Sequence, residues 1–138
     1  MAHAEFARAF EALKAEWRWQ PISMKDHKQV IARMAKESAG RDTTVLNLCD
    51  GDEINGSPGV SIIRTLRKHG LRFTGSDERF YDLTTSKIVM KRLFDDAGVP
   101  TAPWAVVQRD GVGCAPHFRS IGSPLILKPA ISAGSLGI

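Results

Sequence analysis

Short apolar runs alternate with helix-periodic segments along this chain, and that alternation limits the possible folds more than any other feature. Apolar residues at helical spacing predict helices over 5–19, 24–38, 58–69 and 83–97. Runs of apolar residues predict strands at 43–49, 71–74, 104–107 and 125–128, and residues 108–122 read as a loop or weak helix. Helices placed between short strands are typical of an α/β fold with at least part of its sheet parallel.

Composition and charge exclude several classes of protein. The chain has 138 residues, 43% hydrophobic and 25% charged, as expected of a globular chain rather than a coiled coil, a disulfide scaffold or a disordered segment. The net charge of +4 is spread without a basic stripe, so we expect no nucleic-acid partner. Cys49 and Cys114 fit no zinc or redox spacing, which suggests reduced thiols. No apolar run approaches the ~18 residues of a membrane span, so we expect a cytoplasmic protein with no membrane partner.

Two lysines are candidates for binding an anion. Lys87 shares a predicted helix face with Met90 and Phe94, where an ammonium must either reach solvent or meet a negative charge. Lys128 ends the predicted strand 125–128 and precedes the Gly/Ser loop, residues 130–137. Small residues let backbone amides approach a phosphate closely, although an ordinary flexible turn would have the same composition.

A third candidate is the acidic loop, residues 50–59, which begins Asp50-Gly51-Asp52-Glu53 directly after a predicted strand. Clustered carboxylates at a strand end could bind a metal or an amine. A solvated turn is the alternative interpretation.

Four elements in order make residues 71–138 resemble the ATP-grasp ligases, most closely those of the D-alanine–D-alanine ligase type. They are Arg72-Phe73-Thr74-Gly75-Ser76, then Thr84-Thr85-Ser86-Lys87, then Ala97-Gly98-Val99-Pro100, and finally Leu125-Ile126-Leu127-Lys128-Pro129 with Gly134-Ser135-Leu136-Gly137. Lys87 follows Gly75 by twelve residues, the spacing found in the family.

The resemblance implies a fold and site residues. We expect a pre-ATP-grasp-like parallel sheet with helices over 1–80, followed by an incomplete first part of an ATP-grasp α+β domain over 81–138. Lys87 and Lys128 match the lysines that bind ATP phosphates, and Gly134, Ser135 and Gly137 match the loop that covers them. Family members use ATP and Mg²⁺ to phosphorylate a carboxylate, and an amine then attacks the acyl phosphate. We therefore expect ATP and small amino-acid-like substrates as partners, with a homodimer left open.

The chain also departs from the family. Its acidic loop lacks the family's histidine, and Gly134 replaces the first serine of the phosphate loop. The resemblance places the magnesium ligands and the catalytic arginine beyond Ile138, so we assign no catalytic residue and no metal ligand here. We expect a ligase fragment that is inactive alone. The alternatives are a non-catalytic nucleotide-binding or regulatory module, and an α/β interaction domain whose lysines are incidental.

Overall fold

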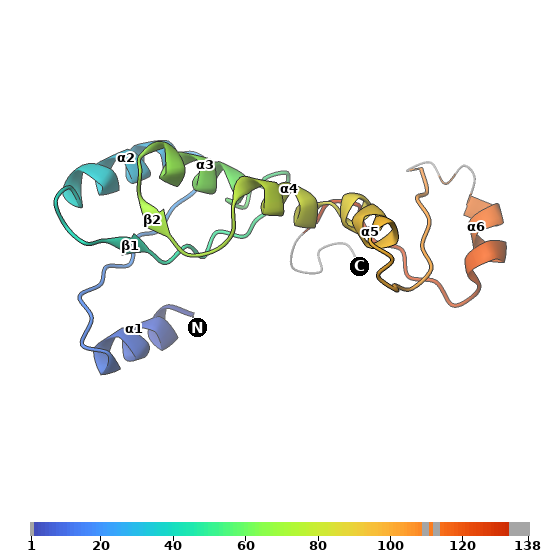
Figure 1. Ribbon diagram of the computed structural model, residues 1–138, viewed down its shortest axis with the longest axis horizontal. Coiled ribbons are helices and arrows are strands. Elements are labelled where there is room, and N and C mark those ends of the chain that lie inside the picture. Colours follow the sequence, from blue (N-terminus) through green and yellow to red (C-terminus); the bar gives the residue numbers. More distant parts are fainter. Residues whose placement is uncertain (1, 109–110, 112–113, 133–138) are drawn as a thin grey trace.

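The computed structural model describes residues 2–108, 111 and 114–132, and these combine helices with a small parallel sheet (Figure 1). The elements run in the order α1 (Ala2–Ala12), α2 (His27–Glu37), β1 (Thr44–Val45), α3 (Val60–Lys68), β2 (Arg72–Phe73), α4 (Glu78–Thr85), α5 (Lys87–Asp96) and α6 (Cys114–Ile121). This arrangement is compatible with the predicted α/β class. The division into domains at 1–80 and 81–138 stays a prediction. No helix of the described residues is long and apolar enough to cross a membrane.

The core lies between the sheet and the two helices that cover one of its faces. β1 and β2 are parallel, with Val45 opposite Phe73, and α2 and α3 lie on the same side of them (Figure 1). Ile31 of α2 packs against Ile62 and Leu66 of α3, and all three are at most 2% exposed. The parallel pairing and the helix–sheet packing therefore follow the sequence prediction.

Helix α3 shows how the sequence specifies this core. Ile62, Ile63 and Leu66 recur at helical spacing on one face, and all three are buried. Gly70 then adopts a left-handed φ of +67°, which a glycine reaches without steric cost, and its amide bonds to the carbonyl of Arg67. The prediction of a helix over 58–69 is confirmed to within two residues at its start.

The first predicted strand is shorter and more exposed than expected. Residues 43–49 were expected to form a buried strand, but β1 covers only Thr44–Val45. Val45 and Cys49 pack against the core, whereas Leu46 and Leu48 are 41% and 46% exposed. The reason is that alternate residues point to opposite faces, and among the described residues no helix packs on the second face of the sheet.

The N-terminal helix is also shorter than predicted. Periodicity indicated a helix over 5–19, but α1 ends at Ala12 and Lys14 takes a left-handed φ of 51°. The chain then reverses, which brings the Trp17 ring to 5.4 Å from that of Phe10. Apolar spacing alone could not distinguish this reversal from a longer helix, because both bring Trp17 onto the same aromatic face.

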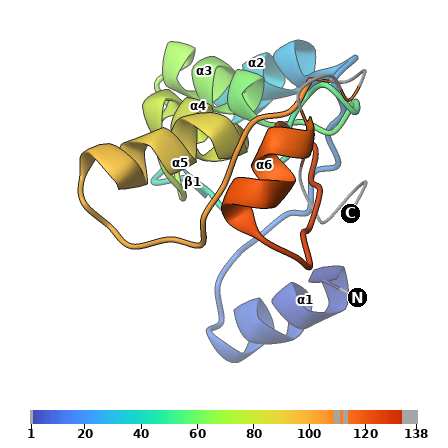
Figure 2. The same ribbon diagram turned by 90° about the vertical axis from the view of Figure 1, so that its right-hand side faces the viewer.

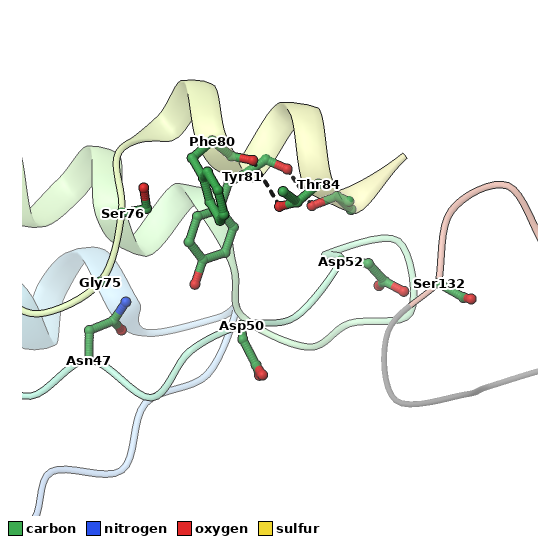
Figure 3. Close-up of a pocket in the computed structure, with 10 residues that line it drawn as sticks. Asn47, Asp50, Asp52, Gly75, Ser76, Phe80, Tyr81, Thr84 and Ser132 are labelled. Atoms are coloured by element: carbon green, nitrogen blue, oxygen red, sulfur yellow. Dashed lines mark hydrogen bonds between the residues drawn. The ribbon is translucent and has the colours of Figure 1, made fainter. Parts of the chain in front are cut away.

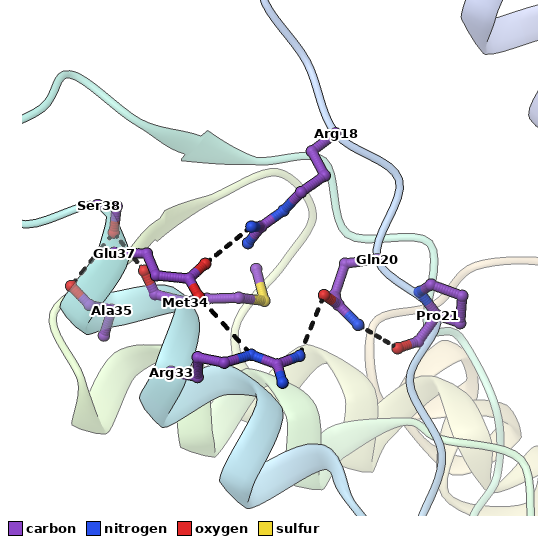
Figure 4. A network of polar contacts seen from close by, with 8 residues as sticks. All are labelled: Arg18, Gln20, Pro21, Arg33, Met34, Ala35, Glu37 and Ser38. Atoms are coloured by element: carbon purple, nitrogen blue, oxygen red, sulfur yellow. Dashed lines mark hydrogen bonds and ion pairs between the residues drawn. The ribbon is translucent and has the colours of Figure 1, made fainter.

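Helix α1 lies apart from the other helices in both views (Figures 1 and 2). The segment that returns from it is tied to α2 by polar contacts (Figure 4). Arg18 forms an ion pair with Glu37 at 2.8 Å, and Arg33 donates to the side chain of Gln20. These contacts are exposed, so they orient the segment more than they stabilise it.

The predicted helix over 83–97 is in fact two helices. Ser86 separates α4 from α5 with an extended ψ of 112°, and its hydroxyl accepts the amide of Val89 as the cap of α5. The hydroxyls of Thr84 and Thr85 bond to carbonyls one turn earlier in α4. Because such side chains compete for backbone hydrogen bonds, a Thr-Thr-Ser run is a weak point in a helix.

The two later predicted strands are not observed. Residues 104–107 and 125–128 are irregular, and Ile126 and Leu127 are 74% and 75% exposed. A strand needs a hydrogen-bonded neighbour, and the described residues offer this part of the chain only a single antiparallel bridge between Ser86 and Ile131. The predicted loop or weak helix at 108–122 contains α6.

Candidate functional site

A pocket of about 400 Å³ opens at the carboxyl ends of the two strands, beside α4 (Figure 3). This is where ligands bind in many parallel α/β sheets. Asn47 and Ser76 enter the pocket shortly after β1 and β2, respectively. The strand ends are held together by two hydrogen bonds of Thr74. The amide of Thr74 donates to the carbonyl of Val45, and the hydroxyl of Thr74 accepts a bond from the amide of Asn47.

Tyr81 connects α4 to the segment that follows β1. Its hydroxyl donates to the carbonyl of Cys49 over 2.6 Å, and its ring lines the pocket. Burial, and then the charge of Asp50, raises the pKa of the Tyr81 phenol. Burial and then the charge of Asp50 likewise raise the pKa of the Cys49 thiol. Both groups therefore stay protonated at neutral pH, and the Asp50 carboxylate lies within electrostatic range of each.

The acidic loop is held in one conformation by its own backbone. The amide of Gly51 donates to the carbonyl of Pro58 over 2.8 Å, and the amide of Glu53 donates to the carbonyl of Ser57 over 3.1 Å. A Cβ atom on Gly51 would collide with the backbone of Ser57, and one on Gly59 would collide with the carbonyl of Gly51. The two glycines thus permit a close approach between the two ends of the loop.

Glu53 serves the fold rather than the pocket. Its carboxylate accepts the amides of Gly59 and Ser61 over 3.2 Å and 2.6 Å, at the start of α3. Partial burial raises the pKa of Glu53, but the bonds from Ser61 and Gly59 and the charge of Arg64 outweigh it and lower the pKa overall. An anion here also complements the positive end of the helix dipole.

The other two acidic side chains of the loop line the pocket. Asp52 also accepts the backbone and side-chain amides of Asn55, and Asp50 follows Cys49 directly. One carboxylate of the loop thus stabilises the start of a helix and two line a pocket, and the binding of a metal or an amine by the loop stays a prediction. In the part of the chain that the structure describes, no group of three or more His, Cys, Asp or Glu could hold a metal ion.

Lys87 meets the start of the Gly/Ser loop. Its ammonium donates to the carbonyl and the hydroxyl of Ser132 over 3.1 Å and 2.9 Å, and its backbone amide donates to the carbonyl of Ala130 over 2.8 Å. Ser132 also lines the pocket. A partly buried ammonium beside a loop of small residues can bind an anion such as a phosphate at this edge.

The remaining predicted phosphate contacts are not assembled by the described residues. Lys128 is exposed and makes no hydrogen bond or ion pair within the described ranges. Gly134, Ser135 and Gly137 lie outside the described residues. Lys87 contacts Ser132 at the start of the Gly/Ser loop, and the roles of all five residues in binding phosphate stay predictions.

Sequence reasoning missed Asn47, Ser76 and Tyr81. The first two could have been found from the rule that residues after parallel strands face a common crevice. Tyr81 gave no such signal, because α4 itself was not predicted to begin before residue 83.

Comparison with known proteins relates part of the chain to one group of enzymes. The chain is 36% identical over 100 residues to a D-alanine–D-alanine ligase of Methylacidiphilum infernorum, and the matched residues cover 71% of this chain and 30% of that protein. It is 34% identical over 70 residues to a D-alanine–D-alanine ligase of a Synechococcus strain, covering 50% of this chain and 22% of that protein. A D-alanine–D-alanine ligase of Verminephrobacter eiseniae is 29% identical over 69 residues, which is 50% of this chain and 20% of the relative.

The matches cover only part of each relative. The chain spans less than one third of the length of these curated relatives. No protein-family model matches it. No solved structure matches it. About half of the chain or more is thus related, at modest identity, to proteins named D-alanine–D-alanine ligase.

Proposed function

We propose that this chain is part of an ATP-dependent carboxylate–amine ligase of the ATP-grasp type, similar to D-alanine–D-alanine ligases, and that it binds the phosphates of ATP. The observation that carries this proposal is the contact of Lys87 with Ser132, which joins the helix lysine to the Gly/Ser loop. The relatives named as ligases support it, because their similarity covers half of the chain or more.

The chemistry of such a ligase explains why these residue types are needed. An amine does not displace oxide from a carboxylate, so a carboxylate oxygen must first be phosphorylated to become a better leaving group. ATP, when bound, would supply the phosphoryl group that forms an acyl phosphate. The task of this chain would be to hold the triphosphate, with Lys87 and Lys128 as cations and Gly134, Ser135 and Gly137 as a loop of close donors.

The pocket and the proposed phosphate site share an edge at Ser132. The carboxylates Asp50 and Asp52 face the pocket, whereas Lys87 contacts Ser132. An amine-bearing substrate would therefore bind on the acidic side and the phosphates on the lysine side. This polarity agrees with a reaction that joins an amine to a phosphorylated carboxylate.

A binding measurement on this chain tests the proposal. We expect MgATP to bind the 138-residue chain in isothermal titration calorimetry. Lys87→Ala should weaken binding by about tenfold to a hundredfold, the effect of losing charge-assisted hydrogen bonds to a phosphate. Lys28→Ala on α2, an exposed lysine at a distance from the pocket, is the matched control and should leave the affinity unchanged. Equal affinities for the chain and for Lys87→Ala, or no binding of MgATP at all, would refute the proposal.

A further inference from the structure

The pocket at the strand ends has two acidic side chains among its lining residues. Asp50 and Asp52 both line it, and the lining contains no lysine or arginine among the described residues. Figure 3 shows the two carboxylates apart from one another, with Asp52 toward the Ser132 side and Asp50 toward the Tyr81 side. A ligand with a single positive charge would meet only one of them closely.

Aromatic rings of α4 form another wall of the pocket. Phe80 and Tyr81 are consecutive residues of this helix, and both line the pocket. Phe80 is 52% exposed, so its ring is accessible to a ligand in the pocket. Ring faces can pack against an alkyl chain and attract an ammonium group.

The backbone holds Asp50 in place. Tyr81 anchors the carbonyl of Cys49, the residue before Asp50, and the bond from Gly51 to Pro58 fixes the residue after it. A side chain on a fixed backbone segment needs less reordering when it binds a cation, so more of the interaction contributes to affinity.

From these contacts we propose that the pocket selects an amino acid whose side chain carries a second amino group, rather than a small neutral amino acid such as alanine. The proposal rests on the proposed function, because it names the substrate class of that ligase. One ammonium would face Asp52 and the other Asp50, with the alkyl chain along Phe80 and Tyr81. The substrate carboxylate would then point toward Lys87 at the Ser132 edge.

The size of the pocket agrees with this choice. A volume of about 400 Å³ lies within the range of small-molecule sites and leaves most of the space empty around a methyl side chain. The charge agrees as well, because two carboxylates favour a ligand with a net positive charge over a neutral zwitterion.

The test compares ligands of equal length with and without the second charge. Lysine and norleucine, each as both enantiomers, and D-alanine are titrated into the 138-residue chain by calorimetry without ATP. We expect one lysine enantiomer to bind at least about tenfold more tightly than norleucine or alanine, the effect of one charge-assisted hydrogen bond. Asp50→Asn should remove about the same factor. Asp96→Asn on α5, which removes an equal charge outside the pocket, should not.

Two results would overturn the proposal: norleucine or alanine binding as tightly as lysine, or Asp50→Asn leaving the affinity for lysine unchanged. Parallel titration of the unmodified chain with MgATP separates this proposal from the function on which it rests. Binding of lysine without binding of ATP would refute the ligase and retain the selective pocket. Binding of ATP with no preference for lysine would refute the selectivity alone.

Discussion

Leu66→Ala should destabilise the chain strongly, because Leu66 lies at the centre of a small core. Its side chain is 1% exposed and packs with Ile31 and Ile62, while Val45 and Phe73 of the sheet contact the same cluster. Shortening it removes buried methyl groups and leaves a cavity between α2, α3 and the sheet. The described residues bury few other large apolar side chains that could fill this space.

The expected cost follows from the burial. Replacing a fully buried leucine with alanine lowers the free energy of unfolding by about 2–5 kcal/mol, and the upper part of the range applies where neighbours cannot collapse. A domain of this size is stable by about 5–15 kcal/mol, so the loss is a large fraction of the total. We expect about 4 kcal/mol.

Urea unfolding followed by far-ultraviolet circular dichroism measures this change. The matched control is Leu13→Ala, because Leu13 is 73% exposed after the end of α1 and its loss should stay within about 0.5 kcal/mol. A cost below about 1 kcal/mol for Leu66→Ala, or equal costs for the two variants, would show that the core is not where the structure places it.

Two further predictions concern the acidic loop. The lowered pKa of Glu53 means that its contribution to stability is present above the unfolded value of about 4.5 and is lost as the pH falls through the lower folded value. Urea midpoints measured from pH 7 down to pH 3 should therefore fall less steeply for Glu53→Gln than for the unmodified chain. The exposed control Glu11→Gln should match the unmodified chain. Equal slopes for all three proteins would contradict the stabilising role of the Glu53 carboxylate. Gly59→Ala should lower the melting temperature clearly, because its Cβ would collide with the carbonyl of Gly51. The control Gly56→Ala meets no atom within 4 Å but keeps a strained left-handed φ, so it should lower the free energy of unfolding by only about 1 kcal/mol. An unchanged melting temperature for Gly59→Ala would refute the close approach of Gly59 to Gly51.

Periodicity predicted the parts of the fold that carry their own packing face. Ile62, Ile63 and Leu66 specify α3, and Val30 and Ile31 specify α2, because each set buries one helix face in the core. The parallel pairing of β1 with β2 followed from the helix between them. These elements need few contacts from elsewhere in the chain.

Periodicity failed where the partner of a segment decides its conformation. The run 125–128 has the composition of a buried strand, yet Ile126 and Leu127 are exposed because the described residues provide no strand beside them. At Ser86 apolar spacing alone continues the helix, although the Thr-Thr-Ser run is a local weak point; the pairing of the Ser86 backbone with Ile131, which is distant in sequence, could not be predicted. Long-range pairing of this kind leaves no local signal.

The sequence also indicated some residues of the candidate site and missed others. Lys87 was identified because an ammonium on an apolar helix face needs an acceptor, and Ser132 provides two. Tyr81 was missed because its role depends on the carbonyl of Cys49, which only the folded chain brings near. Charge on an apolar face can be read from sequence, whereas a contact between two distant segments cannot.

The most direct test of the central claim is a residue-resolved titration with MgATP, followed by the backbone amide signals in heteronuclear NMR. The proposed phosphate site predicts that the largest shifts occur at Lys87 and Ser132 and in the Gly/Ser loop that follows, with small shifts in α1 and α2. Lys87→Ala should abolish the shifts at Ser132 at the same nucleotide concentration. Saturable shifts confined to α1 or α2, with Lys87 and Ser132 unmoved, would contradict the account.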